Sequence, residues 1–488
     1  MRRFVVLLLA CLLLPPGAGA QTPATVTILH LNDIYEITPV EGGRSGGLAR
    51  VATLRADLKR RDPALLTTLG GDYLSPSALG TARVNGQPLA GQQMVAVLNT
   101  LGLDWATFGN HEFDVSEAAF RARLAESKFH IVSSNVTDAS GQPFPGTVTH
   151  AVVPIRRGAR TVRIGLIGVT LDSNQVPWAR YAPPIAAARQ AVLALEGQCD
   201  AIVALTHLSL AGDQQLVEEV PRIDLVLGGH EHENWLLRRG PAFTPIVKAD
   251  ANVRTMAIVT LRFGRKGQRP SVDARLVPIT DRMKDDPRTA AEVAKWTELG
   301  FAGFRQQGFE PARVVATSTS SLDGRESAVR NGQTRLTTII AESVRHEAGT
   351  ADAAIYNGGS VRIDDVLPPG PVTQYDVIRV LPFGGKILRA TMTGALLARV
   401  LDAGFQNRGT GGFLLWDGIT HESSGFRIGG QPIDPARRYV IAITDFLLTG
   451  REVNLGFLSR DNPDVSDVTE LRDVRLALID ELKRQFPR

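Results

Sequence analysis

Short apolar runs separated by helix-length stretches place the strongest constraint on the fold of the first half of the chain. The runs are rich in Val, Ile, Leu and Thr, and they lie at 26–31, 64–69, 104–108, 162–169, 201–205 and 224–228. Segments with helical spacing, such as LARVATLRADLKRR at 48–61 and ARQAVLALEG at 188–197, lie between them. This alternation is typical of stacked βαβ units. The sequence therefore predicts an α/β fold.

A single long helix is predicted to connect two domains. Residues 285–308 have helical spacing, open with Asp285-Asp286-Pro287 and end in Gly308, which are common start and stop signals of a helix. We therefore predict a linker helix at 283–310 between a first domain at 24–282 and a second α/β domain at 311–488. The second domain contains AAIYNGGSVR, the helix-like TMTGALLARVLDAG and the strand-like RYVIAITDFLL.

The N-terminus predicts export. Residues 1–20 combine two arginines, an apolar run that ends at Leu14, two prolines and the small-residue sequence Ala18-Gly19-Ala20, which is the pattern of a cleaved signal peptide. A transmembrane anchor would need about 20 apolar residues. A lipid-attachment box ending at Cys11 is also disfavoured, because the apolar run continues beyond it. We predict a periplasmic or extracellular protein without stable membrane insertion.

The charge distribution argues against a nucleic-acid polymer as the partner. The formal net charge is +4, and the arginines are scattered through the chain, whereas nucleic-acid binding usually needs a concentrated basic patch. Once the leader is removed, Cys199 is the only cysteine, so an intramolecular disulfide is excluded. The sequence does not indicate an oligomeric state.

Polar residues directly follow the strand-like runs of the first domain. They are acids, an amide and imidazoles, namely Asp33, Asp72, Asn110, His111, His207, His230 and His232. Because the carboxyl ends of parallel strands line one edge of a sheet, these side chains are expected to converge. The remaining histidines are interpreted as structural or surface residues: His30, His130, His150, His346 and His421.

Mixed carboxylate, amide and imidazole donors favour Zn, Mn, Fe or Co over Ca or Mg. Three oxygen donors and three imidazoles, the set without His111, exceed the needs of one tetrahedral site. The set therefore predicts two divalent metal ions that share a carboxylate, an arrangement found in enzymes that hydrolyse phosphate esters.

The same residues carry a resemblance to a known family. Asp33, Gly71-Asp72, His207 and Gly229-His230-Glu231-His232 resemble the metallophosphoesterase signature, and GNHEFD at 109–114 resembles the exported 5′-nucleotidase family. YNGGSVR at 356–362 and VLPFGGKI at 380–387 are similar to the C-terminal nucleotide-binding domain of that family. The resemblance implies a four-layer α/β/β/α sandwich followed by a smaller α/β domain.

The resemblance also implies roles for individual residues. Asp72 would bridge the two ions, with Asn110, His207 and His230 on one ion and Asp33 and His232 on the other. A metal-held hydroxide would attack phosphorus in line. His111, held by Asp114, would assist departure of the alcohol. We assign no role to Glu112.

In the second domain the resemblance implies a substrate site. Asn357, Arg362 and Phe383 would bind the nucleoside, and Phe446 would form the other face of a sandwich around the base. Arg330 is a further candidate contact with phosphate or ribose. The substrate implied by these residues is a nucleotide or a related phosphate ester.

Three segments depart from the family pattern, and one of them is the degraded motif near Gln333 to Thr338. The expected Asp-x-His motif reads Asp33-Ile34-Tyr35-Glu36. Three interpretations fit this change: the phenol ligates a strongly acidic ion such as ferric iron, Glu36 reaches inward, or water fills the position. Near the C-terminus, TGREVNLGF at 449–457 replaces an acidic glycine-rich segment, with Glu452 as a stand-in for the acid.

These features predict a 5′-nucleotidase that removes phosphate from nucleoside 5′-monophosphates. A 2′,3′-cyclic-nucleotide phosphodiesterase/3′-nucleotidase and a UDP-sugar hydrolase are alternatives with the same chemistry. A nucleotide-binding protein with weak or lost turnover is an alternative of a different class, motivated by Tyr35 and the altered C-terminal segment.

Overall fold

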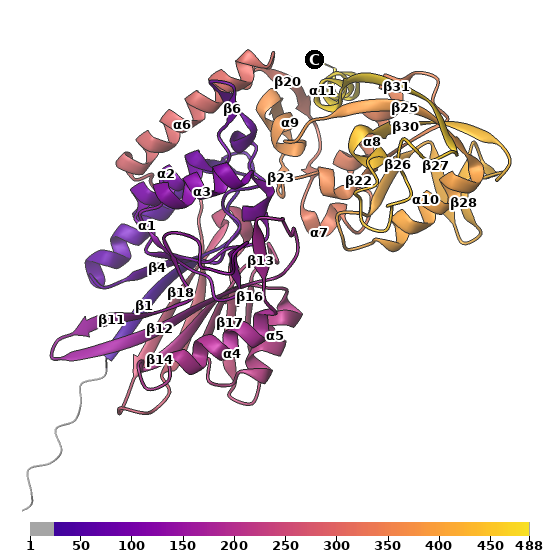
Figure 1. Ribbon diagram of the computed structural model, residues 1–488. Helices are drawn as coiled ribbons and strands as arrows, with labels where there is room; N and C mark the ends of the chain where they lie inside the picture. Colours follow the sequence, from indigo (N-terminus) through magenta and orange to yellow (C-terminus); the bar gives the residue numbers. More distant parts are fainter. Residues whose placement is uncertain (1–23, 488) are drawn as a thin grey trace, which may run out of the picture.

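The computed structural model describes residues 24–487, which form two α/β domains joined through a long helix, α6 (Pro287–Gln306) (Figure 1). The predicted leader at 1–20, with its cleavage site and Cys11, lies outside the described residues. None of the helices formed by residues 24–487 is both long and apolar enough to cross a membrane.

Two β-sheets form the centre of the first domain. The first sheet has the order β10 (Thr147–Val148), β8 (His130–Val132), β7 (Trp105–Ala106), β4 (Leu66–Leu69), β1 (Ala24–Leu31), β18 (Thr255–Phe263) and β19 (Ser271–Pro278). The second has the order β11 (His150–Arg157), β12 (Arg160–Thr170), β14 (Ala201–His207), β15 (Leu225–Gly228), β17 (Thr244–Lys248) and β16 (Trp235–Arg239).

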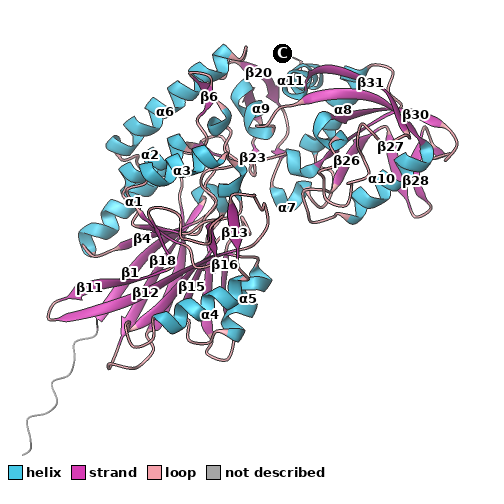
Figure 2. Cartoon of the chain, viewed as in Figure 1, coloured by secondary structure: helices cyan, strands magenta, loops and turns pink. Residues whose placement is uncertain are grey.

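The two sheets pack face to face through an apolar layer. Ile28 of β1 is buried in one cluster with Leu166 of β12 and Leu205 of β14. Helices α1 (Leu48–Arg61), α2 (Gln92–Leu101) and α3 (Glu117–Glu126) cover the first sheet, and α4 (Pro184–Ala194) and α5 (Leu210–Glu219) cover the second (Figure 2). The predicted four-layer α/β/β/α sandwich is therefore confirmed. Burial of the central strands on both faces explains their nearly continuous apolar sequences.

Parallel pairing aligns the carboxyl ends of the strands that precede the polar residues. Leu31 of β1 pairs with Leu69 of β4, which in turn pairs with Ala106 of β7. In the second sheet, Thr170 of β12 pairs with His207 of β14. The loops that follow these strands consequently meet at one edge of the sandwich.

Helix α6 belongs to the helical layer of the first domain. Asp286 caps it by accepting a hydrogen bond from the Thr289 amide, and Pro287 occupies the first turn, as is common at helix starts. Trp296 and Phe304 are buried in the core cluster that also contains α1 and α2. The helix lies within the predicted linker, but it packs along the first domain.

The second domain contains a five-stranded sheet with helices on both faces. Its strand order is β26 (Leu414–Asp417), β22 (Ala353–Asn357), β30 (Arg438–Thr444), β25 (Lys386–Thr393) and β31 (Val465–Asp473). Helices α8 (Arg335–Ala348) and α11 (Val474–Gln485) pack on one face, and α10 (Gly394–Gln406) packs on the other. The predicted α/β class of this domain is confirmed.

Short elements complete the described chain. In the first domain they are β2 (Pro39–Val40), β3 (Ser45–Gly46), η1 (Leu79–Thr81), β5 (Arg83–Val84), β6 (Gln87–Pro88), η2 (His111–Asp114), β9 (Val136–Asp138), β13 (Ala179–Tyr181) and η3 (Ala251–Val253). In the second they are β20 (Val314–Ser318), β21 (Leu322–Asp323), α7 (Glu326–Val329), η4 (Gly358–Ser360), β23 (Val366–Leu367), β24 (Gly370–Thr373), α9 (Gln374–Val380), β27 (Ile419–Glu422), β28 (Gly425–Ile428), β29 (Gln431–Pro432) and η5 (Asp445–Leu448).

A buried polar network joins the two domains. Tyr375 of α9 donates a hydrogen bond to Glu36 Oε2 at 3.0 Å, and its ring lies 4.9 Å from that of Phe301 on α6. Arg379 of α9 lies 3.5 Å from Glu36 Oε1 and 2.6 Å from Asp365 Oδ2. Glu36, Asp365 and Arg379 are all buried. The guanidinium therefore neutralises carboxylates of both domains at once.

Arg379→Met is expected to weaken the junction between the domains, because it leaves Glu36 and Asp365 buried without a cation. Removing one partner of a buried ion pair typically destabilises a protein by about 3–5 kcal/mol. Urea unfolding followed by tryptophan fluorescence should show a clearly lower midpoint. Arg472→Met is the matched control, because Arg472 is half exposed and exposed pairs contribute less than about 1 kcal/mol. Equal midpoints for the two variants would contradict this role of Arg379.

His30 is a structural histidine, as the sequence predicts. It is buried between the sheets, where Nε2 donates to the Gly228 carbonyl at 3.1 Å and Nδ1 accepts from the Thr68 hydroxyl at 3.0 Å. Both nitrogens of the neutral ring are thus satisfied. Burial lowers the pKa of His30 to about 4, compared with about 6.5 in an unfolded chain.

Stability should consequently fall as the pH drops from about 6.5 toward 4, because the unfolded state binds a proton that the folded state refuses. The difference between the two pKa values corresponds to about 3 kcal/mol. We expect His30→Gln to flatten this part of the stability profile in urea unfolding at several pH values. The exposed His421→Gln serves as the control and should keep the wild-type slope. A His30→Gln profile as steep as that of the wild type would refute the assignment.

Candidate metal centre and active site

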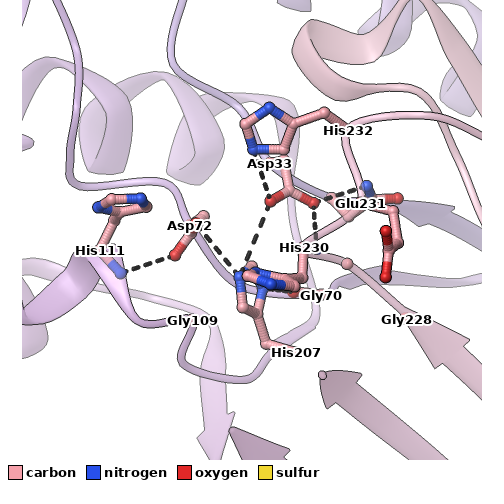
Figure 3. Close-up of polar contacts among 12 residues, drawn as sticks. Asp33, Gly70, Asp72, Gly109, His111, His207, Gly228, His230, Glu231 and His232 are labelled. Carbon is pink, nitrogen blue, oxygen red and sulfur yellow. Dashed lines mark hydrogen bonds and ion pairs between the residues drawn. The ribbon is translucent and has the colours of Figure 1, made fainter. Parts of the chain in front are cut away.

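The predicted ligands converge at the carboxyl edge of the two sheets. They come from the loops after β1, β4, β7 and β15 and from the end of β14: Asp33, Asp72, Asn110, His230, His232 and His207. Figure 3 shows their side chains, with the exception of Asn110, turned toward one centre. Residues separated by almost 200 positions in the sequence are thus placed side by side.

The backbone around the centre adopts conformations that most residues avoid. Asp33, Asp72, His230 and His232 have φ values of 52°, 56°, 83° and 57°, in the left-handed region where non-glycine residues are uncommon. Each such residue costs about 1–3 kcal/mol and persists only where its surroundings impose it. Backbone strain at four of the six predicted metal ligands is typical of a functional site.

Glycines let the loops approach one another closely. A Cβ atom on Gly109 would lie 2.0 Å from Asp72 Oδ1, and one on Gly229 would lie 2.4 Å from the carbonyl oxygen of Gly70. Gly71 has a φ of 85°, and its Cβ would lie 2.8 Å from His207 Nδ1. A side chain at any of these positions would push the ligand groups apart.

The donor atoms are close enough to share cations. Ligand atoms of Asp33, Asp72 and His232 all lie within 4.8 Å of one another. His207 Nε2 lies 3.2 Å from Asp72 Oδ2. His207 Nδ1 donates to the Gly70 carbonyl at 2.7 Å, and such an outer hydrogen bond fixes the tautomer of a metal-binding histidine.

Unpartnered buried atoms fit the requirement for a metal. Asn110 Oδ1 and His207 Nε2 are buried but have no hydrogen-bond partner. Buried polar atoms without a partner are uncommon in native proteins and often mark an ion or a catalytic role. The chemistry of the donor set and the burial of these two atoms both suit divalent cations.

Neighbouring charges shift the pKa values of the buried groups at this centre. Burial opposes ionisation of Asp72, but the nearby His207 and His111 hold the pKa of its carboxyl below the ordinary range. Burial lowers the pKa of His207, yet the charges of Asp72 and Asp33 raise it to about 9. Burial, reinforced by His207, lowers the pKa of His230 to about 3. Nearby positive charge therefore stabilises the buried carboxylates of Asp33 and Asp72. A bound metal ion would supply this charge in place of protons.

Tyr35 lies inside the ligand set, whereas Glu36 lies outside it. The Tyr35 hydroxyl is 2.8 Å from His232 Nε2 and 3.2 Å from Asp72 Oδ2. Glu36 instead accepts from Tyr375 and pairs with Arg379 of the second domain. The interpretation that Glu36 reaches inward is wrong, because the interdomain network already satisfies its carboxylate.

His111 and Asp114 form a hydrogen-bonded pair on the single turn η2. His111 Nδ1 lies 2.5 Å from Asp114 Oδ2, and the His111 amide donates to Asp72 Oδ1 at 2.9 Å. Asn174 donates to Asp114 Oδ1 at 2.7 Å. The bond at Nδ1 leaves Nε2 of His111 for a substrate. No sequence motif pointed to Asn174, because it lies in a loop far along the chain.

Glu112 organises the loop that carries Asp72. Its buried carboxylate accepts hydrogen bonds from the amides of Asp72 at 2.9 Å, Tyr73 at 2.7 Å and Leu74 at 3.1 Å, and also from the amide of Gly109. One side chain thus ties the loop after β4 to the loop after β7. The sequence offered one signal that we did not use, namely a second carboxylate beside Asp114 in the polar turn at 109–114.

The second domain directly contacts one of the predicted metal ligands, His232. Asp364 Oδ2 lies 3.1 Å from His232 Nδ1, and Glu326 Oε2 lies 3.6 Å from the same nitrogen. A cavity of about 520 Å³ lies beside this contact and is lined by residues of both domains, including His230, Arg254 and Arg330. Arg330 pairs with Glu326 at the wall of the cavity. Sequence reasoning found neither Asp364 nor Glu326.

The other predicted substrate residues lie outside the lining of this cavity. Phe383 and Phe446 are 57% and 41% exposed, which is unusual for large aromatic side chains and leaves their rings free to contact a ligand. The Arg362 guanidinium lies 5.8 Å from the Phe383 ring centre. Asn357 donates to Glu452 Oε2 at 2.7 Å. Glu452, the predicted stand-in for the family's acid, thus lies beside Asn357, a predicted contact of the nucleoside.

Glu112→Gln is expected to disorder the loop that carries Asp72 and thereby the candidate metal site. The amide replaces one acceptor oxygen with a donor that faces backbone N–H groups, and an unsatisfied buried group costs about 1–3 kcal/mol. Thermal unfolding should show this loss, and metal titration should show weaker binding. The partly exposed Glu117→Gln in α3 is the control. Wild-type metal affinity in Glu112→Gln would show that the carboxylate does not position Asp72.

Comparison with known proteins matches both domains. Residues 26–234 match the calcineurin-like phosphoesterase family, and residues 314–457 match the 5′-nucleotidase C-terminal domain. Protein UshA of Yersinia enterocolitica is 25% identical over 89% of each chain. Human 5′-nucleotidase is 24% identical over 83% of this chain and 76% of its own length.

A solved structure shows the same fold over nearly the whole chain. The 5′-nucleotidase precursor of Thermus thermophilus aligns with a TM-score of 0.76 and 21% identity, covering 95% of this chain and 97% of its own. A metallophosphoesterase domain implies the use of divalent metal. The chain therefore combines a calcineurin-like phosphoesterase domain with a 5′-nucleotidase C-terminal domain and is a phosphoric-ester hydrolase.

Proposed function

We propose that the protein is an exported 5′-nucleotidase that removes phosphate from nucleoside 5′-monophosphates. The observation that supports this function is the close approach of Asp33, Asp72, His207 and His232, with the His111–Asp114 pair beside Asp72 and a cavity lined by both domains. The catalytic domain would comprise 24–282 and the substrate domain 311–488, with 283–310 as the connection. Export remains a prediction from residues 1–20.

Two divalent cations, drawn from Zn, Mn, Co and Fe, are proposed for the centre. Asp72 would be the shared ligand, with Asn110, His207 and His230 on one side. Asp33 and His232 would hold the other side. When bound, such cations neutralise phosphoryl oxygens and activate water for in-line attack.

The protein groups contribute orientation and a proton. With Nδ1 held by Asp114, the His111 ring presents Nε2 to the leaving oxygen of the substrate, where the protonated ring stabilises developing negative charge. Asn174 keeps Asp114 in place through its hydrogen bond to Oδ1. The Glu112 carboxylate keeps Asp72 rigid, so that little reorganisation accompanies the reaction.

The second domain is proposed to select the substrate. Phe383 and Phe446 would stack on the base, because exposed aromatic rings offer large flat contact surfaces. Arg330, at the wall of the cavity, would contact phosphate or ribose, and Asn357 and Arg362 would contact the nucleoside. Nucleotides bound this way would place phosphate toward His230 and His232.

A substrate panel tests the function and separates the alternatives. Phosphate release should be fastest from AMP in the presence of Mn, Co or Zn. Preference for 2′,3′-cyclic AMP with 3′-AMP, or for UDP-glucose, would instead assign the two related activities. The absence of turnover on all four substrates would indicate a binding protein and contradict the proposed 5′-nucleotidase function.

His111→Ala should lower kcat for AMP by about 10²–10⁴-fold, the usual contribution of a positioned acid or base. Metal content measured by elemental analysis should stay at the wild-type level, because the side chain of His111 is not a proposed ligand. The exposed His130→Ala is the matched control and should keep wild-type kcat. A normal kcat in His111→Ala would remove His111 from the mechanism.

A further inference from the structure

Tyr35 is held rigidly among the proposed metal ligands. Its ring is 3% exposed and lies 5.3 Å from the ring centre of His232. The amides of Tyr35 and Glu36 both donate to Asn252 Oδ1, at 2.9 Å and 3.1 Å. Backbone and ring are thus fixed independently, and the hydroxyl points into the centre.

The surroundings of the phenol oxygen are those of a ligand atom. It lies 2.8 Å from His232 Nε2, 3.2 Å from Asp72 Oδ2 and 3.4 Å from Asp33 Oδ1. One hydroxyl proton serves only one of these three acceptors, whereas a cation placed among them contacts all four atoms. No other tyrosine of residues 24–487 has its hydroxyl hydrogen-bonded to a proposed metal ligand.

We propose that Tyr35 ligates, as a phenolate, the cation held by Asp33, Asp72 and His232, and that it biases this position toward a hard trivalent ion such as ferric iron. The inference rests on the ligand set of the proposed function and replaces one of its two divalent ions with a trivalent ion. The phenol O–H bond breaks, a metal–oxygen bond forms, and the proton passes to solvent. Iron enters already oxidised, so no electron transfer is involved.

Charge and ligand hardness support the bias. The position offers three anionic oxygens, two from carboxylates and one from the phenolate, beside a single imidazole. An imidazole in place of Tyr35 would leave two anionic oxygens and a set that suits zinc. Selectivity among metals follows from ligand type and geometry, so a third anionic oxygen favours a more highly charged ion.

Spectroscopy tests the ligand independently of turnover. Purified protein is stripped of metal, loaded with a ferric salt and a zinc salt, and assayed for bound iron. A ferric phenolate has a visible charge-transfer absorption and phenolate vibrations in the resonance Raman spectrum. We expect both signals in wild type and their complete loss in Tyr35→Phe, which keeps the ring and hence the packing.

Two further variants sharpen the test. Tyr181→Phe is the matched control, since Tyr181 lies in the same domain with its hydroxyl unpartnered, and it should keep both signals. Tyr35→His should lose the signals, bind zinc at both positions and retain less iron than wild type. Circular dichroism checks that each variant is folded.

Three outcomes would overturn the proposal. These are bound ferric iron without a charge-transfer band, a band that survives in Tyr35→Phe, and iron retention in Tyr35→His equal to that of wild type. Phosphate release from AMP, measured on the same samples with Mn, reports on the proposed function separately. A Tyr35-dependent band without phosphate release would support Tyr35 as a metal ligand and contradict the nucleotidase function. Phosphate release without the band would support the nucleotidase function and contradict Tyr35 as a ligand.

Discussion

Two buried carboxylates at the edge of the sandwich are the constraint on which the rest of the site depends. Asp33 and Asp72 are almost completely buried, 0% and 1% exposed, and lie close to a shared centre. Buried charges are unfavourable unless they are paired or bind metal. The left-handed backbone at both residues and the absence of a side chain at Gly109 bring these groups together. Binding of cations would offset the cost of that arrangement.

Much of the fold and of the metal centre could be predicted because the informative residues sit beside strands. Parallel strands buried on both faces have continuous apolar sequences, and their carboxyl ends align. A polar residue directly after such a run, as with Asp33 and His207, is therefore placed by the strand itself. The positions of α1 and α6 were also visible in the sequence, since helical spacing and the cap at Asp286 are local features.

The missed residues depend on contacts that no local pattern encodes. Asn174 reaches Asp114 across 60 positions, and Asp364 reaches His232 from the other domain. Glu112 was visible, but its role follows from the direction of four amide groups. Those directions are set by how the loops after β4 and β7 fold around each other, and such tertiary geometry lies beyond the reach of a one-dimensional pattern.

The two residues that replace the expected motif face in opposite directions. Tyr35 turns toward the proposed cations, while its neighbour Glu36 turns toward Tyr375 and Arg379 of the second domain. One short segment carries both side chains, and Asn252 holds its backbone in place. His232 is linked in the same way through Asp364. The candidate metal centre and the domain junction therefore share the short segment at Tyr35 and Glu36 and the contact between His232 and Asp364.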